Sequence, residues 1–297
     1  MTDEAVSIPS AGLRLSGVVR LPRDLRTGER RAAFLVLHGF GSNKNSSNVL
    51  QPSKVLNDLG YVTLAFDMRG CGESEGEFGR VICLEQVEDT RSAVTFLAKH
   101  PAVDPRRIGL IGSSFGGAVA VYSGGVDTRV AAVISNGGWG DGERKFRGQH
   151  KSAEEWTRFV NMLKAGREHR AKTGKSLMVP RYEIVPIPPH LRHNLASNSI
   201  EMFPAETAQS MYEFRADDVV ADMEGRPLLL LHSSVDSVTP TEQSVELFKR
   251  ARQPTDLHLF AETDHFMFAE SNTRVRTVLL DWLEKYFPVK AAKVAAA

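Results

Sequence analysis

The sequence has few cysteines, no excess of either charge and no long apolar run. Only two cysteines, Cys71 and Cys83, occur in 297 residues, which excludes a disulfide framework and favours a reducing compartment such as the cytoplasm. Lys plus Arg number 37 and Asp plus Glu number 36, so the basic excess of a typical nucleic-acid-binding protein is missing. No stretch approaches the roughly 20 apolar residues that span a bilayer. The first residues, M-T-D-E-A-V, are acidic where a signal peptide is basic and then apolar. We therefore expect a cytoplasmic protein with no nucleic-acid or membrane partner.

Signatures of cofactors and metals are missing as well. No G-x-G-x-x-G or G-x-x-x-x-G-K-[ST] element stands between an expected strand and helix, so a nucleotide cofactor is not predicted. The spacing of Cys and His residues is not that of a metal site. We expect no cofactor and no metal.

What the sequence does contain is a series of short, continuous apolar runs. They cover residues 32–37, 61–66, 107–111, 130–135, 228–231 and 257–260. Runs without alternation indicate strands that are buried on both faces, as in a parallel sheet. Helical spacing of apolar residues lies between them, over residues 81–99, 115–123, 241–251 and 272–287. This alternation predicts an α/β fold, a doubly wound and mostly parallel sheet flanked by helices. The alternating residues 13–19 predict an antiparallel element at its edge.

One long connection breaks this rhythm. The fourth run ends at residue 135 and the fifth begins at residue 228, whereas most connections in α/β proteins are a few residues long. We expect residues 139–215 to form an inserted lid, and residues 1–138 and 216–297 to form the core. Ser152 and Glu155 have the spacing of a capping box, followed by an amphipathic helix with Gly174 as a plausible end. Residues 141–193 contain 12 Lys plus Arg and 6 Asp plus Glu. This excess is either a solvated cationic surface or a lid that favours an anionic acyl substrate.

The most specific motif is G-S-S-F-G at residues 112–116. It follows an apolar run and precedes an apolar segment, which is the strand–turn–helix context of a G-x-S-x-G nucleophile elbow. The central serine is Ser114. The flanking glycines remove Cβ atoms from a sharp turn, and the helix N-terminus favours developing negative charge. The sequence thus predicts that Ser114 is a nucleophile.

A nucleophilic serine needs a base, and the base needs an orienting acid. In proteins built on such an elbow these residues follow in the order nucleophile, acid, histidine. Among nine histidines, His265 combines this order with a loop position after the last strand. Asp236 follows the fifth strand, in a loop at the carboxyl end of the sheet. The rival acids fit less well, because Asp264 adjoins His265 while Asp217 and Asp218 precede the strand.

Backbone donors for an oxyanion are expected at two places. One is the N–H of Phe115, the residue after the nucleophile. The other is the N–H of Phe40, in the glycine-rich turn after the first core strand. Trp139 and Phe40 are candidates for an aromatic wall of the substrate pocket.

These motifs resemble those of the α/β-hydrolase-fold serine hydrolases. Residues 38–41 (H-G-F-G), residues 112–116, the Asp236 loop and the His265 loop match the order found in that superfamily. Residues 67–74, D-M-R-G-C-G-E-S, are similar to the D-x-R-G-x-G-x-S loop of many members. The likeness is greatest to the esterase, feruloyl-esterase and acyl-peptidase-like branches.

This resemblance implies acyl hydrolysis, since dehalogenase and epoxide-hydrolase relatives carry Asp where this chain has Ser114. It also implies a lid at the inserted position and structural roles for Asp67 and Arg69. We expect an esterase that cleaves a carboxylic ester of a small or medium substrate, with aromatic and anionic acyl groups among the candidates, through an acyl-enzyme on Ser114 and without a cofactor. A homodimer is compatible with this assignment. The alternatives are an acyltransferase, an amidase or peptidase, a thioesterase, or a non-catalytic ligand-binding member of the fold.

Overall fold

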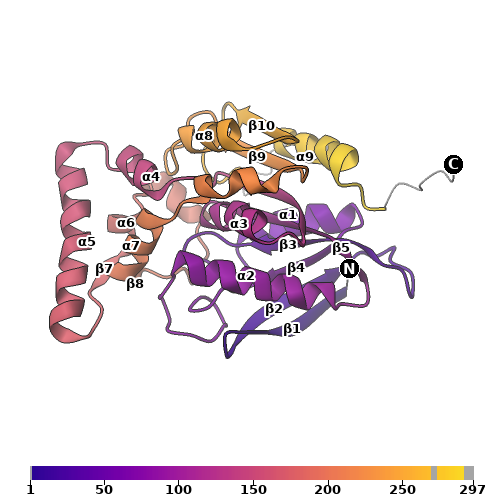
Figure 1. Ribbon diagram of the computed structural model, residues 1–297, viewed down its shortest axis with the longest axis horizontal. Helices are drawn as coiled ribbons and strands as arrows, with labels where there is room; N and C mark the ends of the chain where they lie inside the picture. Colours follow the sequence, from indigo (N-terminus) through magenta and orange to yellow (C-terminus); the bar gives the residue numbers. More distant parts are fainter. Residues whose placement is uncertain (1, 269–272, 291–297) are drawn as a thin grey trace.

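The computed structural model describes residues 2–268 and 273–290, and its centre is an eight-stranded sheet (Figure 1). The spatial order of the strands is β1-β2-β4-β3-β5-β6-β9-β10. Their bounds are β1 (Thr2–Ser10), β2 (Leu13–Leu21), β3 (Arg31–Leu37), β4 (Val62–Phe66), β5 (Val103–Ser113), β6 (Val130–Asn136), β9 (Leu228–Ser233) and β10 (Thr255–Phe260).

Strands β3 to β6, β9 and β10 pair in parallel, and each contains one of the six apolar runs. The prediction of a mostly parallel sheet is confirmed. Strand β3 shows why the runs are continuous: Ala33 and Leu35 face one apolar core while Phe34 and Val36 face the other. The predicted antiparallel element is also present, but β2 pairs with both β1 and β4, so β1 forms the edge.

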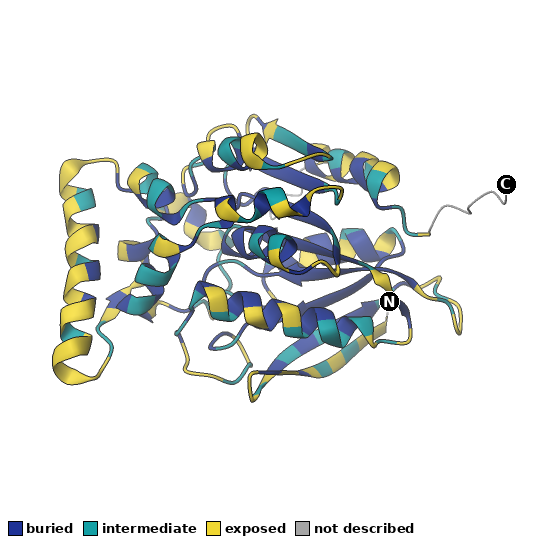
Figure 2. Cartoon of the chain, viewed as in Figure 1, coloured by how far each residue is buried: buried dark blue, intermediate teal, exposed yellow. Residues whose placement is uncertain are grey.

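Helices cover both faces of the sheet (Figures 1 and 2). One face carries α2 (Cys83–Ala98), α3 (Phe115–Val126) and α8 (Glu242–Arg250), and the other carries α1 (Ser47–Asp58) and α9 (Thr273–Tyr286). The four predicted helices are confirmed, although residue 272 lies outside the described residues. Helix α1 was not predicted, because it contains Pro52 and begins with polar residues, features typical of loops.

Residues 139–215, the inserted segment, lie at one end of the molecule (Figure 1). The elements are α4 (Gly142–Gln149), α5 (Ala153–Thr173), β7 (Met178–Pro180), α6 (Arg181–Ile184), η1 (Pro189–Asn194), β8 (Met202–Pro204) and α7 (Ala205–Glu213). The capping box of Ser152 and Glu155 forms, and Gly174 ends α5 in the left-handed conformation, with φ at 72°. The short helices η2 (Ala216–Asp218) and η3 (Val220–Met223) lead back to β9.

The chain order places the loops that bear the predicted site at one edge of the sheet. From β3 the chain adds β4 on one side, and later adds β5 and β6 on the other, so a topological switch point lies between β3 and β5. Loops at the carboxyl ends of strands meet at such a point and form binding sites. Here β3 leads into His38, β5 into Ser114, β9 into the Asp236 loop and β10 into the His265 loop. No helix among the described residues is long and apolar enough to cross a membrane.

Candidate active site

Ser114 lies on a strained turn between β5 and α3. Its φ of 55° and ψ of −116° are unusual for a residue with a side chain. A Cβ at Gly112 would lie 2.0 Å from the carbonyl oxygen of Gly116, and a Cβ at Gly116 would lie 2.5 Å from that of Leu37. Gly112 is therefore needed for the tight closure of the elbow on itself, and Gly116 for the close approach of the elbow to the end of β3.

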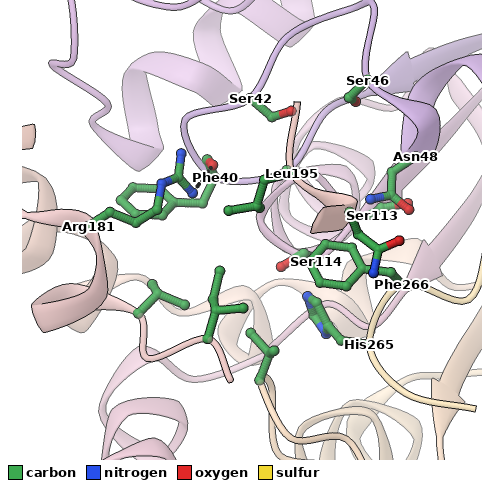
Figure 3. A pocket seen from close by; sticks show the side chains of 15 residues that line it. Phe40, Ser42, Ser46, Asn48, Ser113, Ser114, Arg181, Leu195, His265 and Phe266 are labelled. Atoms are coloured by element: carbon green, nitrogen blue, oxygen red, sulfur yellow. Dashed lines mark hydrogen bonds between the residues drawn. The ribbon is translucent and has the colours of Figure 1, made fainter. Parts of the chain in front are cut away.

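Asp236 and His265 are joined by a hydrogen bond. The Nδ1 atom of His265 lies 2.8 Å from Oδ2 of Asp236, and both side chains are almost fully buried. The other carboxylate oxygen, Oδ1, accepts hydrogen bonds from the backbone N–H groups of Val238 (2.8 Å) and Thr239 (2.7 Å). Figure 3 shows the His265 ring and the Ser114 hydroxyl facing each other across one pocket.

A second histidine, His232, touches the same carboxylate. Its Nε2 atom lies 3.3 Å from Oδ2 of Asp236 and 3.0 Å from the carbonyl oxygen of Thr239, while Nδ1 lies 2.6 Å from the Ser244 hydroxyl. The Nε2–H group therefore donates to the carbonyl, and Nδ1 accepts from the hydroxyl. His232 is fully buried, so its position suits it to hold Asp236 in place.

The charge of Asp236 is strongly stabilised. Burial raises the pKa of this carboxyl, but the neighbouring His265 charge and the hydrogen bonds to His232 and His265 outweigh that effect and hold the pKa well below its usual range. Asp236 is thus ionised at neutral pH and can orient an imidazole. The rejected candidate Asp264 binds backbone and hydroxyl groups instead of the His265 ring, accepting from the backbone N–H and the hydroxyl of Ser237 at 2.9 and 2.6 Å and from the backbone N–H of His265 at 2.7 Å.

The turn after β3 packs directly over Ser114. A Cβ at Gly39 would lie 3.8 Å from the Ser114 Cβ. His38 is buried and its Nε2 accepts from the Met68 N–H at 3.1 Å, so its Nδ1–H donates to the Gly39 carbonyl at 2.8 Å. Burial lowers the pKa of His38, consistent with a neutral ring. Phe115 is the first residue of α3, so its N–H has no partner in the helix ladder.

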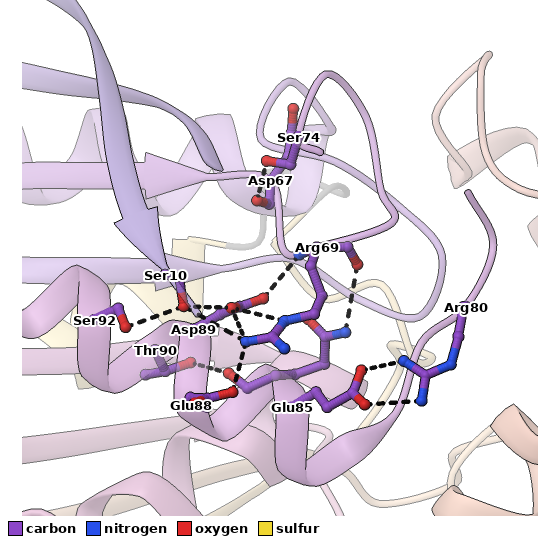
Figure 4. A network of polar contacts seen from close by, with 11 residues as sticks. Ser10, Asp67, Arg69, Ser74, Arg80, Glu85, Glu88, Asp89, Thr90 and Ser92 are labelled. Atoms are coloured by element: carbon purple, nitrogen blue, oxygen red, sulfur yellow. Dashed lines mark hydrogen bonds and ion pairs between the residues drawn. The ribbon is translucent and has the colours of Figure 1, made fainter. Parts of the chain in front are cut away.

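The loop of residues 67–74 is held by ion pairs of Asp67 and Arg69, the two residues for which the resemblance implied structural roles. Asp67 is buried and binds the Lys44 ammonium at 2.7 Å and the Lys44 backbone N–H at 2.6 Å. Arg69 pairs with Asp89 at 2.6 Å and with Glu88 at 2.8 Å (Figure 4). These contacts fix the loop against the turn after β3 and against α2.

The pocket beside Ser114 and His265 has about 550 Å³ of space, part of it open to solvent. Its apolar lining comes from Phe40, Val185, Ile187, Leu195, Val238 and Phe266. Ser46 and Asn48 also line it, and the Ser46 hydroxyl and the Asn48 side-chain oxygen are buried with no hydrogen-bond partner among the described residues. Val185, Ile187 and Leu195 belong to the inserted segment, which therefore supplies part of the pocket wall (Figure 3).

Trp139 does not have the position expected of it. The side chain is 1% exposed and packs edge-on against Phe115 with 5.7 Å between ring centroids, and it is not among the described residues that line the pocket. The indole is part of the apolar core, and the Lys145 side-chain nitrogen lies 4.8 Å from its ring centroid. Phe40, the other residue expected in the aromatic wall, does line the pocket, and Phe266 lines it with Phe40.

Sequence reasoning did not single out two cations of the inserted segment. Arg181 is 2% exposed and lines the pocket, and Lys145 is 1% exposed against the rings of Trp139 and Phe146. Neither has a carboxylate within 4 Å among the described residues. No sequence signal separates them from the other basic residues of the segment, since burial and partners depend on the fold.

Lys145 provides a test of burial by titration. Its ammonium nitrogen lies 3.9 Å from the Phe146 ring centroid and 2.8 Å from the Gln149 side-chain oxygen. Burial lowers the pKa of Lys145 from 10.5 to about 7.

Between these two pH values the Lys145 amine binds a proton in the unfolded chain but not in the folded protein. The free energy of unfolding therefore rises with pH, by up to about 1.4 kcal/mol per pH unit. We expect Lys145→Met to remove this slope in urea unfolding at pH 7, 8 and 9. Lys172→Met, at an exposed position, is the control and should keep the slope. Equal slopes for wild type and Lys145→Met would refute the claim that burial lowers the pKa of Lys145.

The protein belongs to a family of serine hydrolases. A family model described as "Serine aminopeptidase, S33" matches residues 28–272, which include the turn after β3, the elbow and the loops of Asp236 and His265. The resemblance to the α/β-hydrolase superfamily and the fold class are thereby confirmed. Membership of this family supports a hydrolase activity but does not specify which kind of acyl bond is cleaved.

Three individual proteins illustrate the relationship. The chain is 27% identical over 294 residues to an uncharacterised 31.7 kDa protein from the traX-finO intergenic region of Escherichia coli, covering 92% of this chain and 98% of that protein. It is 27% identical over 273 residues to the thiohydrolase aneE of Aspergillus aculeatus, covering 86% and 83%. The crystal structure of the alpha/beta hydrolase GrgF from Penicillium sp. sh18 superposes with a TM-score of 0.79 at 21% identity, covering 96% and 99%.

Proposed function

We propose that this protein is a serine esterase that works through an acyl-enzyme on Ser114. The observation that carries the proposal is the strained elbow, which presents the Ser114 hydroxyl to a pocket shared with the His265 ring, itself hydrogen-bonded to Asp236 at 2.8 Å. Nucleophile, base and orienting acid are the minimal set for acyl transfer to serine.

In this mechanism Ser114 Oγ attacks the acyl carbonyl carbon while Nε2 of His265 takes the hydroxyl proton. Asp236 accepts a hydrogen bond from the Nδ1–H group of the ring. This bond keeps Nε2 free to accept the serine proton and stabilises the imidazolium that forms. The N–H groups of Phe40 and Phe115 bind the oxyanion. The imidazolium then gives its proton to the leaving alkoxide, which departs as an alcohol. Water, deprotonated by the same ring, releases the carboxylic acid and restores Ser114.

The pocket lining supports an acyl group of medium size. Each methylene placed against Val185, Ile187 or Leu195 contributes about 0.8 kcal/mol, or about a fourfold rise in kcat/KM. With p-nitrophenyl esters of increasing acyl length, kcat/KM is expected to climb by roughly this factor per methylene and then fall once the pocket is full. A value that is highest for acetate and declines from there would contradict a medium acyl pocket.

The Ser46 hydroxyl and the Asn48 side-chain oxygen, which have no hydrogen-bond partner in the part of the chain that the structure describes, favour a substrate with a polar group at that end of the pocket. Aromatic acyl esters with and without a ring hydroxyl test this on the same assay. A hydrogen bond made at a buried site is worth about 1 kcal/mol, so we expect the hydroxylated ester to show about fivefold higher kcat/KM. We also expect Asn48→Leu to remove the difference.

Thioester hydrolysis is the second candidate, favoured by the relative that is named a thiohydrolase. The same residues would act, with a thiol leaving in place of an alcohol. Matched oxygen and thio esters of one acyl group separate the two activities, because a thioesterase shows the higher kcat/KM on the thioester after correction for the uncatalysed rates.

A further inference from the structure

The inserted segment delivers one buried arginine to the turn that holds Phe40. Arg181 follows β7 directly, and Phe203 lies on β8, where Val179 and Phe203 pair across the two strands. The backbone N–H of Arg181 donates to the Glu201 carbonyl at 2.7 Å. The small sheet therefore fixes both side chains relative to each other. The Phe203 ring stacks on the Phe40 ring, with centroids 4.2 Å apart.

The Arg181 guanidinium binds three backbone carbonyls. Nη1 donates to Phe40 at 2.9 Å, Nη2 to Gly41 at 3.0 Å and Nε to Ile200 at 2.7 Å. The Ile200 N–H also donates to the Gly41 carbonyl, at 2.9 Å. Figure 3 shows the guanidinium beside Phe40, on the side of the pocket away from His265.

These contacts complete the fixation of the oxyanion turn. In a trans peptide the C=O and N–H groups point in opposite directions, so the His38 bond to the Gly39 carbonyl sets the direction of the Phe40 N–H. Arg181 holds the next two carbonyls, those of Phe40 and Gly41. Phe40 thus lies between peptide groups that are held on both sides, one by the core and one by the inserted segment.

The charge of Arg181 has no carboxylate partner within 4 Å among the described residues. Burial lowers the pKa of this guanidinium to about 10, which still leaves it charged at neutral pH. Among the described residues, three carbonyl oxygens and the rings of Phe40 and Phe203, whose centroids lie 5.2 and 5.4 Å from the guanidinium carbon, surround a side chain that is 2% exposed. A positive charge in so dry a position acts strongly on negative charge that develops nearby.

We propose that Arg181 is a positioning residue for the oxyanion hole, holding the Phe40 amide in place from the inserted segment. The inference rests on the proposed acyl-enzyme mechanism. Arg181 contributes in the transition state, when the substrate's carbonyl oxygen becomes an oxyanion. Arg181 itself fits neither reading first given for the basic residues of the segment, because three of its guanidinium donors are committed to the protein's own backbone. An anionic substrate bound by Arg181 is the competing outcome of the test.

The test is the kinetics of Arg181→Met and Arg181→Lys on neutral and anionic p-nitrophenyl esters. Loss of one oxyanion donor costs about 10²–10³ in kcat, and loosening it costs part of that, so we expect kcat of Arg181→Met to fall about 10–100-fold. KM is expected to stay within about threefold for both kinds of ester. Lysine keeps the charge but cannot span two carbonyls as a planar fork does, so Arg181→Lys should recover little. The exposed Arg167→Met, in α5, is the matched control and should match wild type.

A transition-state analogue gives the second readout. An alkyl trifluoromethyl ketone adds to serine and places a charged oxygen in the oxyanion hole, so its inhibition constant should rise in parallel with the loss of kcat. If Arg181→Met does not fold, as judged by thermal unfolding, Arg181→Lys alone decides the question.

Two results overturn the proposal. One is a folded Arg181 variant with wild-type kcat and inhibitor affinity. The other is a rise in KM confined to anionic esters, which assigns Arg181 to substrate charge instead. Ser114→Ala on the same assay separates failure of the proposed function from failure of this inference. Full activity of Ser114→Ala would contradict the acyl-enzyme mechanism. An inactive Ser114→Ala together with a fully active Arg181→Met would contradict only the positioning role of Arg181.

Discussion

Replacing Ser114 with alanine is expected to lower kcat for the best ester by at least about 10⁴-fold, because the nucleophile of the acyl-enzyme is lost. The fold should be unaffected. The Ser114 backbone N–H donates to the Asn136 carbonyl at 2.8 Å, and that bond does not involve the hydroxyl. Steady-state kinetics, with thermal unfolding as the check on folding, measure the effect.

The neighbouring serine is the matched control for this variant. Ser113 also lines the pocket, but its hydroxyl accepts a 3.3 Å hydrogen bond from the Asn136 side chain. Ser113→Ala should lower kcat by less than about 10-fold. If Ser113→Ala is the inactive variant and Ser114→Ala turns over normally, the elbow has been assigned to the wrong serine.

Asp236→Asn is expected to lower kcat by about 10⁴-fold, through the tautomer of His265. Oδ1 of Asp236 accepts two backbone N–H groups, from Val238 and Thr239. The asparagine oxygen will occupy that place, so its NH₂ group will face His265 Nδ1. The ring must then carry its proton on Nε2, where it cannot accept the proton of Ser114.

Asp264→Asn is the control for this second variant, because Asp264 adjoins His265 in the chain but binds Ser237 and the His265 backbone N–H, and its side-chain oxygen can keep accepting as an amide. It should cost less than about 10-fold in kcat. The ¹⁵N shifts of His265 report the tautomer directly. An Asp236→Asn protein with the wild-type tautomer and a 10⁴-fold loss of kcat would show that the acid acts in some other way.

Much of the fold could be predicted because its causes are local. A strand that packs helices on both faces needs an unbroken apolar run, and β3, β4 and β9 have such runs. Helix α1 lacks a local signal, since Pro52 lies inside it and its stability comes from burying residues such as Val49 and Leu56 under the sheet. Tertiary packing decides such a segment, and the sequence shows that packing only indirectly.

In the candidate site too, residues with a local sequence signal could be predicted and residues placed by tertiary contacts could not. Ser114, Asp236 and His265 were selected by a local motif and by the rule that loops at the carboxyl ends of strands meet, and the structure brings the three together, while their catalytic roles stay predictions. Arg181 could not be found in this way. Its partner carbonyl at Phe40 is 141 positions away in the chain, and a carbonyl carries no sequence signature. Trp139 was misplaced for a related reason, since an aromatic residue near a site packs into the core as readily as into a pocket.

The central claim is that Ser114 becomes covalently acylated, and active-site labelling tests it most directly. The native protein is treated with a fluorophosphonate, and the modified residue is identified by peptide mass spectrometry. The account predicts one adduct per chain, on Ser114, that disappears when the protein is unfolded first and forms far more slowly in His265→Ala. An adduct on another residue, or none on native protein that hydrolyses esters, would contradict it.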